Sequence, residues 1–272
     1  MNILFLGDIV GRSGRDALAK HLPKIRVDLK LDFIVVNAEN ATAGIGLNVE
    51  HAKYILSLGV DCITLGDHAF DQREMLTYIQ QEPRIIRPIN FAKTAPGNGS
   101  GIFNTASGKK VLVAQVLGQV FMKKNFSDPF SSLDVILNKH KLGIVCDAVL
   151  VDVHAEATSE KMAIGHWCDG RASLVIGTHT HIPTSDLQVL NKGTAYQTDA
   201  GMCGDYNSII GMDRCEPMQR FVTGMSKGRF VPSSGTASIC GVFAKIGAFG
   251  FVEYVSPVRI GGSLEPVSPK AL

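Results

Sequence analysis

The stretch Gly177-Thr-His-Thr-His-Ile-Pro-Thr184 places two histidines, His179 and His181, directly after the apolar run Leu174-Val-Ile176. That run has the length and composition of a buried strand. In extended backbone, residues i and i+2 point to the same side, so we expect both imidazoles to face one point beyond the strand end. Neutral imidazole is a common ligand for zinc, iron, copper and nickel. Taken alone, the stretch fits a metal site and a pair of solvated loop histidines equally well.

Several other predicted strands also end at a carboxylate or an imidazole. The strands are expected at 3–6, 33–36, 62–65 and 148–153, and the polar residues that follow them are Asp8, Glu39 with Asn40, Asp67 with His68, and His154. In open α/β sheets, ligands bind outside the carboxyl ends of the strands. A single such residue is usually a helix cap or a structural histidine. Five strand ends with metal-ligand chemistry in one chain indicate a shared site instead.

The number of these side chains predicts two metal ions. A single catalytic metal typically has about three protein ligands, whereas six potential ligands are present here, namely Asp8, Glu39, Asp67, His154, His179 and His181. Mixed imidazole and carboxylate ligands suit iron, manganese or zinc and argue against calcium or magnesium. No cysteine belongs to these motifs, which argues against an iron–sulfur cluster.

The order of predicted elements indicates an α/β fold, because strands alternate with helices through most of the chain. Helices are expected over 15–20, 49–58, 72–81, 133–140 and 157–167, and further strands over 111–116 and 195–198. Residues 83–110 are predicted to form a long loop with one short hairpin, and the tail from 235 antiparallel strands. We expect a single domain over 1–272, with 202–234 as a candidate insertion or cap.

Composition and charge narrow the functional classes. The 272 residues are 45% hydrophobic and 19% charged, so a sizeable core is expected. A net charge of +2 without long basic runs argues against an extended nucleic-acid surface. No apolar stretch reaches the length of a membrane helix, and the N-terminus lacks the basic region of a signal peptide. Six cysteines without a C-x-x-C pair predict reduced thiols in a cytoplasmic protein.

Four segments make the chain resemble the calcineurin-like metallophosphoesterases and, more narrowly, the YmdB family of bacterial phosphodiesterases. They are Met1-Asn-Ile-Leu-Phe-Leu-Gly-Asp-Ile-Val-Gly-Arg-Ser-Gly-Arg15, Asn37-Ala-Glu-Asn-Ala-Thr-Ala-Gly44, Gly165-His-Trp-Cys-Asp-Gly-Arg-Ala172 and the opening stretch. The resemblance covers essentially the whole chain. It implies a four-layer α/β/β/α sandwich, a dinuclear centre containing iron, and hydrolysis of 2′,3′- and 3′,5′-cyclic nucleotides.

The resemblance also implies roles for individual residues. Asp8 and His181 would hold the first metal, Glu39 would bridge, and Asp67, His154 and His179 would hold the second metal. Asn40 would lie beside the first metal and the substrate phosphate, and His68 would be the general acid. Most of the superfamily has Asp at the position of Glu39 and Asn at the position of Asp67.

The expected reaction is attack by a metal-bridging hydroxide on the phosphodiester, with His68 protonating the leaving oxygen. Thr180 is predicted to contact substrate, and Arg15, Arg171 and the amides of 201–204 are weaker candidates. The sequence also allows another role for His68 and other functions for the chain. His68 could instead orient Asp67. The chain could be a metal- or nucleotide-binding regulator with little turnover, or a phosphomonoesterase such as a 5′-nucleotidase, and it could form a homo-oligomer.

Overall fold

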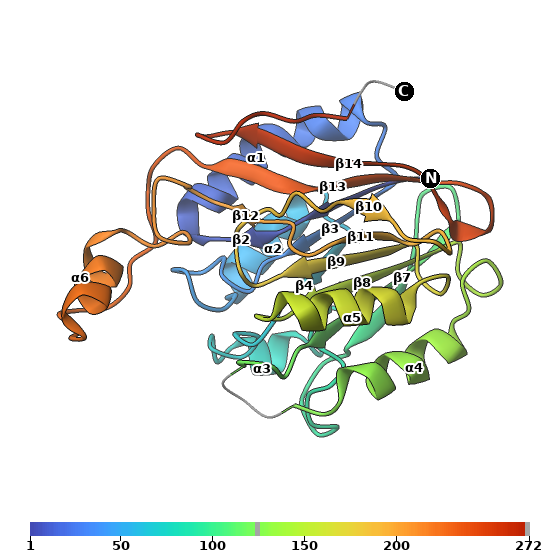
Figure 1. Ribbon diagram of the computed structural model, residues 1–272, viewed down its shortest axis with the longest axis horizontal. Helices are drawn as coiled ribbons and strands as arrows, with labels where there is room; N and C mark the ends of the chain where they lie inside the picture. The colour runs from blue at the N-terminus through green and yellow to red at the C-terminus, as the bar shows by residue number, and fades with distance from the viewer. Residues whose placement is uncertain (123–125, 270–272) are drawn as a thin grey trace.

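Two six-stranded sheets pack face to face in the computed structural model, which describes residues 1–122 and 126–269 (Figure 1). The first sheet has the order β14 (Val252–Gly261), β13 (Ser238–Ile246), β1 (Asn2–Leu6), β3 (Phe33–Asn37), β4 (Cys62–Thr64) and β5 (Ile85–Ile86). The second has the order β10 (Gln188–Val189), β11 (Ala195–Gln197), β9 (Leu174–Thr178), β8 (Ala148–His154), β7 (Lys110–Leu117) and β6 (Ser100–Asn104). A short parallel ribbon joins β2 (Asp8–Ile9) to β12 (Met202–Cys203).

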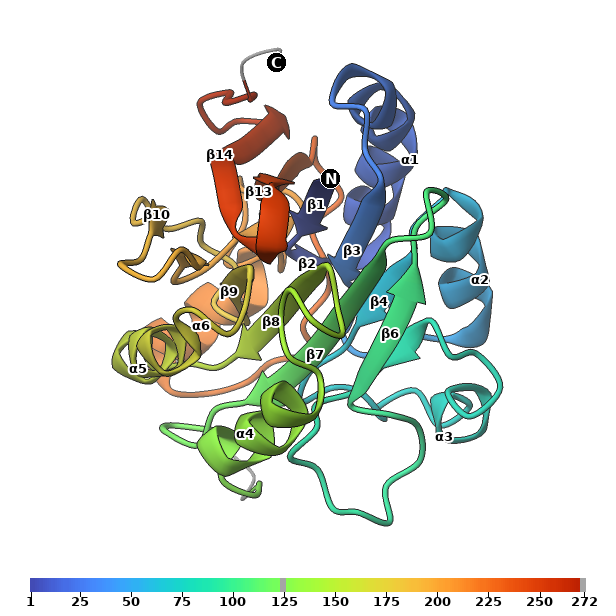
Figure 2. The same ribbon diagram turned by 90° about the vertical axis from the view of Figure 1, so that its right-hand side faces the viewer.

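Helices cover the outer face of each sheet (Figure 2). The helices of the described chain are α1 (Gly11–Asp28), α2 (Val49–Ser57), α3 (Met75–Tyr78), α4 (Pro129–Lys139), α5 (Thr158–Cys168) and α6 (Cys215–Thr223), with a 3-10 turn at Ala248–Gly250, and all but α6 lie against the body. Figure 2 shows α1 and α2 on one side of the molecule and α4 and α5 on the other. The helix α6 stands off from the body at the end of a long excursion (Figure 1).

Strand alternation explains the layers, because successive side chains point to opposite faces. In β1, Ile3 and Phe5 belong to the apolar cluster between the sheets, whereas Leu4 and Leu6 join the cluster beneath α1 and α2. A third cluster fills the space between the second sheet and α4 and α5. The four-layer α/β/β/α sandwich implied by the resemblance is confirmed.

The parallel strands set the position of the site. In the first sheet β1, β3, β4 and β5 run parallel, and in the second β7, β8, β9 and β11 run parallel. The antiparallel tail predicted from 235 onward is present as β13 and β14. Each sheet therefore brings the residues that follow its central strands to one edge.

Several predicted boundaries were wrong. The helix expected over 15–20 is α1, an 18-residue helix that starts at Gly11 and contains Pro23. A Cβ on Gly14 would lie 2.2 Å from the carbonyl oxygen of Cys203, so close packing against β12 requires a poor helix former there. The helix expected over 72–81 is only the four-residue α3. The loop predicted for 83–110 holds β5 and β6, and β6 forms the expected hairpin with β7.

Two further observations concern the chain as a whole. Among the described residues, no helix has both the length and the apolar sequence that a membrane crossing requires. The six cysteines are free thiols, five of them buried.

Candidate metal centre

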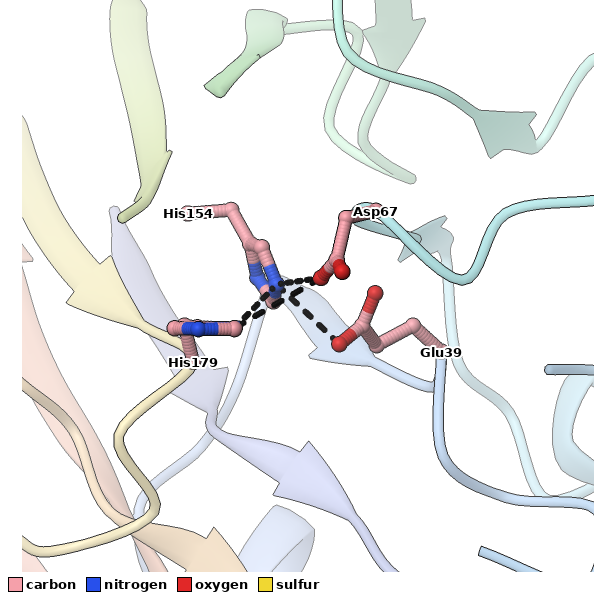
Figure 3. Close-up of side chains that lie close together, drawn as sticks. All are labelled: Glu39, Asp67, His154 and His179. Carbon is pink, nitrogen blue, oxygen red and sulfur yellow. Dashed lines mark hydrogen bonds and ion pairs between the residues drawn. The ribbon is translucent and has the colours of Figure 1, made fainter. Parts of the chain in front are cut away.

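Four side chains converge at the edge where the two sheets meet, as Figure 3 shows. One ligand atom from each of Glu39, Asp67, His154 and His179 lies within 4.8 Å of the others. His154 is central: its Nε2 lies 3.0 Å from Glu39 Oε1, 3.2 Å from Asp67 Oδ1 and 3.0 Å from His179 Nδ1. Two carboxylates and two imidazoles thus point at one small volume, which is a typical arrangement for a transition metal.

A second group adjoins the first through Glu39. The Asn40 amide nitrogen lies 3.4 Å from Glu39 Oε1 and 3.0 Å from His181 Nε2. His181 Nε2 in turn lies 3.8 Å from Asp8 Oδ1. Asp8, Asn40 and His181 therefore form a cluster beside the first one, with Glu39 between the two. The structure brings together the six predicted metal ligands and Asn40, which was predicted to lie beside the first metal.

The backbone that carries the two histidines differs from the extended conformation that we expected. His179 has φ 94° and His181 has φ 66°, both in the left-handed region that non-glycine residues rarely adopt. The two imidazoles consequently face two neighbouring points and not one. Such strain of about 1–3 kcal/mol per residue persists only where surrounding contacts hold it.

Asp199 supplies those contacts. Its Oδ2 accepts hydrogen bonds from the backbone nitrogen of Thr180 at 3.1 Å, from the Thr180 hydroxyl at 2.7 Å and from Lys161 Nζ at 2.8 Å. Lys161 and Asp199 are both fully buried. The hydroxyl proton of Thr180, which we predicted to contact substrate, is committed to Asp199. The pair therefore anchors the histidine loop from behind.

Hydrogen bonds also select the tautomers of two imidazoles. His181 Nδ1 lies 2.8 Å from the carbonyl oxygen of Ile210, which can only accept, so Nδ1 carries the proton and Nε2 keeps its lone pair. The Thr178 hydroxyl donates to Asp152 Oδ1 at 2.7 Å and can then only accept from His154 Nδ1, which lies 2.9 Å away. In both histidines Nε2 therefore faces the centre. Ligand histidines in metal sites are commonly oriented in this way by a hydrogen bond to their other ring nitrogen.

Asp152 is itself held by a buried network that we did not predict. Its Oδ2 accepts from Thr64 Oγ1 at 2.6 Å, Gln115 Nε2 at 2.8 Å and Asn37 Nδ2 at 3.2 Å. Burial raises the pKa of this carboxyl, and its donors oppose that rise. The sequence signal was available, since Asp152 interrupts the apolar run Val149–Val153.

The electrostatics of the first cluster reflect its paired charges. Burial opposes a proton on His154, but the negative charge of Glu39 and hydrogen bonds to Asp67 and Glu39 raise its pKa well above the usual value. Burial would raise the pKa of Glu39 and of Asp67, yet His154 lowers both below their ordinary range. Burial and the charge of His154 lower the pKa of His179 to about 4. Two carboxylates thus demand a positive charge at this point.

In the second cluster, one carboxylate oxygen has no hydrogen-bond partner within the part of the chain that the structure describes. Asp8 is fully buried, and among the described residues its Oδ1 has no hydrogen-bond partner. Burial raises the pKa of Asp8 to about 6. An orphaned carboxylate oxygen that faces an imidazole nitrogen is costly unless a cation binds between them. The donor set therefore fits two metal ions, one for each cluster, with Glu39 within reach of both.

His68 lies at the mouth of the centre. Its backbone nitrogen donates to Glu39 Oε2 at 3.0 Å, and its ring Nδ1 lies 2.7 Å from Asp71 Oδ2. His68 Nε2 is 4.0 Å from Asp67 Oδ2, and the side chain is 34% exposed. The carboxylate of Asp71, whose role we did not predict, holds Nδ1 and leaves Nε2 on the side of Asp67. The spacing His68-x-x-Asp71 was a signal for this pair.

Of the weaker candidates for substrate contact, Arg15 lies near the site, whereas Arg171 and the amides of 201–204 are bound to other groups. Arg171 is bound to Asp134 at 2.7 Å and to the carbonyl of Trp167, ahead of the start of β9 and not at the site edge. The amides of 201–204 are also committed: Gly201 donates to Asp199, Met202 to the Tyr206 hydroxyl and Gly204 to Ser238. Both predictions were wrong, because these groups serve the fold. Arg15 lies beside Ala41, one residue from Asn40.

A family model described as YmdB-like protein matches residues 4–256. The chain belongs to this family. It is 40% identical over 246 residues to the 2′,3′-cyclic-nucleotide 2′-phosphodiesterase of Bacillus subtilis strain 168, covering 90% of this chain and 91% of that protein.

Solved structures give the same relationship. A protein of Thermus thermophilus described as hypothetical has a TM-score of 0.90 and 40% identity, covering 97% of this chain and 100% of that one. A novel phosphatase of Mycoplasma pneumoniae has a TM-score of 0.88 and 33% identity, covering 96% and 93%. A 5′-nucleotidase precursor of T. thermophilus shares the fold alone, with a TM-score of 0.57 and 11% identity over 96% of this chain and 54% of that one.

Proposed function

We propose that this YmdB-like chain is a dinuclear metal-dependent phosphodiesterase that hydrolyses 2′,3′-cyclic nucleotides and, more broadly, 3′,5′-cyclic nucleotides. The observation that carries the proposal is the convergence of Glu39, Asp67, His154 and His179 within 4.8 Å. The name of the B. subtilis relative supports the substrate class and suggests cleavage at the 2′ oxygen, which leaves a 3′-monophosphate.

In this proposal the first metal is held by Asp8 and His181 with Asn40 beside it, the second by Asp67, His154 and His179, and Glu39 serves both. Iron is the proposed metal, with manganese or zinc as alternatives for the same donor atoms. When bound, two such ions supply positive charge to the phosphoryl oxygens and an acidified water as nucleophile. Asn40 directs its amide toward the phosphate.

His68 is the proposed general acid. The Asp71 carboxylate, 2.7 Å from Nδ1, holds the ring in place and leaves Nε2 as the nitrogen that is not bound to Asp71. Nε2 can then give its proton to the leaving ribose oxygen, which is a poor leaving group as an alkoxide. His68 Nε2 also lies 4.0 Å from Asp67 Oδ2, so a role in orienting Asp67 is the alternative that kinetics with good and poor leaving groups must separate from the acid role.

Two architectural assignments complete the proposal. We treat the chain as one domain in a cytoplasmic protein, with 202–234 as a cap over the first metal. The support for the cap is that Ile210, within this segment, accepts the hydrogen bond of His181. Met202 and Cys203 pair with β2, so the cap itself starts after them.

A substrate panel tests the function. Turnover of 2′,3′-cyclic AMP, 3′,5′-cyclic AMP, 5′-AMP and bis(p-nitrophenyl) phosphate should be measured with the metal-loaded protein. We expect the highest kcat/KM for the 2′,3′-cyclic nucleotide and little activity on the monoester. Preference for 5′-AMP would support a 5′-nucleotidase, and binding of cyclic nucleotide without any turnover would support a regulator.

A further inference from the structure

A cavity of about 680 Å³ lies along α1, outside the metal centre. It is lined by α1, the 232–237 loop, the end of β14 and the Thr42–Ala43 turn. None of the residues that line it belongs to the two metal clusters. Its volume lies in the range of small-molecule sites, about 300–1,000 Å³.

The charges that line this cavity are mainly positive. Arg12, Arg15 and Lys20 face it from α1, whereas Asp16 is the one carboxylate among its lining residues. Arg12 and Lys20 are exposed, and among the residues that the structure describes neither has an ion-pair or hydrogen-bond partner. One further carboxylate lies next to a lining residue: the buried Asp205 accepts a hydrogen bond from Ser233 Oγ at 2.5 Å.

The positive charges of the cavity change the pKa values of neighbouring side chains. Burial and the charge of Arg15 lower the pKa of His51, and burial and Lys20 lower that of His21. Burial lowers the pKa of Arg15, the charge of Asp16 raises it, and the charge of Arg12 lowers it. Asp16 therefore partly balances Arg15. Arg12 and Lys20 have no ion pair among the described residues and leave an attractive potential for an anion.

The remaining lining residues provide hydroxyl donors and an apolar wall. Ser234 and Thr236 present exposed hydroxyls, while Ala17, Pro232 and Ala237 provide apolar surface. Guanidinium groups, an ammonium and hydroxyls are the groups that recognise a phosphoryl group. The apolar wall suits an organic body attached to it.

We propose that this cavity is a second ligand site that binds an organic phosphate of nucleotide size, with the phosphoryl group at Arg12 and Lys20. The site is physically linked to the metal centre. Arg15 donates to the carbonyl oxygen of Ala41, and the backbone nitrogen of Gly11 donates to the carbonyl oxygen of Asn40 at 3.0 Å. A phosphate bound here lies one short loop from Asn40.

Calorimetric titration with adenosine 3′-monophosphate tests the proposal on full-length protein dialysed against EDTA, so that metal-bound phosphate does not contribute. The test variant is Arg12→Gln/Lys20→Gln. The control is Lys24→Gln/Lys139→Gln, which removes the same charge from exposed helix positions outside the cavity. We expect one site per chain in wild type and control, with affinity about 10-fold or more lower in the test variant.

Absence of binding to wild-type protein, or equal affinity in the two variants, would overturn the proposal. Adenosine alone should not bind, and binding as tight as that of the monophosphate would rule out phosphoryl recognition. The titration is repeated on metal-loaded protein, where only the test variant should lose a binding event. Thermal unfolding midpoints of the two variants should nearly match, because all four positions are exposed and the Lys24–Asp28 ion pair of the control is a solvated surface pair.

The bound phosphate could come from a separate nucleotide. It could also be the internal phosphodiester of a longer substrate whose cyclic phosphate occupies the metal centre, and this second case rests on the proposed function. A dinucleotide ending in a 2′,3′-cyclic phosphate separates them. If the cavity takes its internal phosphate, Arg12→Gln/Lys20→Gln raises KM for the dinucleotide but not for 2′,3′-cyclic AMP. If a separate nucleotide binds, both KM values stay unchanged while the calorimetric site is lost. Failure of the proposed function would abolish turnover in all proteins without affecting the titrations.

Discussion

The two sheets contribute different chemistry to the candidate metal centre. The first sheet and its β2 extension supply the carboxylates Asp8, Glu39 and Asp67, and the second sheet supplies the imidazoles His154, His179 and His181. Each set alone would be unfavourable when buried, since one is anionic and the other lacks a charge partner. The comparison shows that the centre is a property of the interface between the sheets.

The two sets are also held differently. On the imidazole side, Thr178 with Asp152 and the carbonyl of Ile210 fix ring tautomers, and Asp199 clamps the strained loop. On the carboxylate side, Asp8 Oδ1 has no hydrogen-bond partner among the described residues. The imidazole side is therefore preorganised, whereas part of the carboxylate side depends on a bound cation.

The largest expected effect comes from His68, an imidazole that the carboxylate sheet contributes. His68→Ala should keep both metals and lower kcat by about 10²–10⁴ on cyclic nucleotides, because the leaving oxygen loses its proton donor. Kinetics with nitrophenyl esters give the control, since nitrophenolate needs no proton and the loss should shrink. An equal loss on both substrate types would remove the general-acid assignment.

Asp152→Asn tests preorganisation of the imidazole side. The amide would meet the donors of Thr64, Gln115 and Asn37 with a donor of its own, and the Thr178 relay to His154 would be disturbed. We expect metal affinity to fall by about 10–100-fold. Competition with a fluorescent chelator measures this, and the exposed Asp147→Asn serves as control. Unchanged affinity would show that tautomer selection by this network is unimportant.

The positions of the carboxylates and imidazoles could be predicted from the sequence because strand ends meet at one edge. Their conformations could not. The left-handed φ of His179 and His181 depends on Asp199, which lies 18 residues after His181 and is buried with Lys161. The Asp152 network likewise depends on tertiary contacts, whereas the Asp71 partner of His68 is local and could have been found from its spacing. Local pattern also gave no reason to extend α1 through Gly11, which packs against Pro232, and Gly14, which packs against β12; this packing overrides helix propensity.

Asp8→Asn tests the carboxylate side, and here we expect the metal-free protein to become more stable. Burial raises the pKa of Asp8 from 3.8 to about 6, so the ionised form destabilises the metal-free fold. The folded state holds the extra proton between about pH 4 and 6, and the penalty is complete above pH 6. In EDTA at pH 7 the variant should therefore gain up to about 3 kcal/mol of unfolding free energy. When metal is supplied, it should bind the first metal more weakly.

Urea unfolding at pH 4 and pH 7 measures this gain, with the exposed Asp16→Asn as control. The advantage of Asp8→Asn should shrink toward pH 4, where Asp8 of the wild type is protonated. A loss of stability at pH 7 would mean that the hydrogen bond Asp8 Oδ2 accepts from the backbone nitrogen of His179, at 3.2 Å, outweighs the cost of burying the charge.

The smallest expected effect is that of Asp67→Asn, which removes one negative charge and keeps an oxygen ligand. The more positive centre should bind an anionic phosphodiester better and acidify its water more. With manganese we expect both metals to remain and kcat/KM to rise by less than about tenfold, or the acidic limb of the pH profile to move down. Loss of metal with the fold intact would show that the carboxylate is indispensable and the charge argument is wrong.

Metal stoichiometry tests the central claim most directly. Elemental analysis of the full-length protein, reconstituted with iron or manganese and freed of excess metal, should give two equivalents per chain. Two equivalents are expected because the interface holds one cluster around His154 and a second around Asp8 and His181, with Glu39 between them. At most one equivalent per chain under the same conditions would contradict the account.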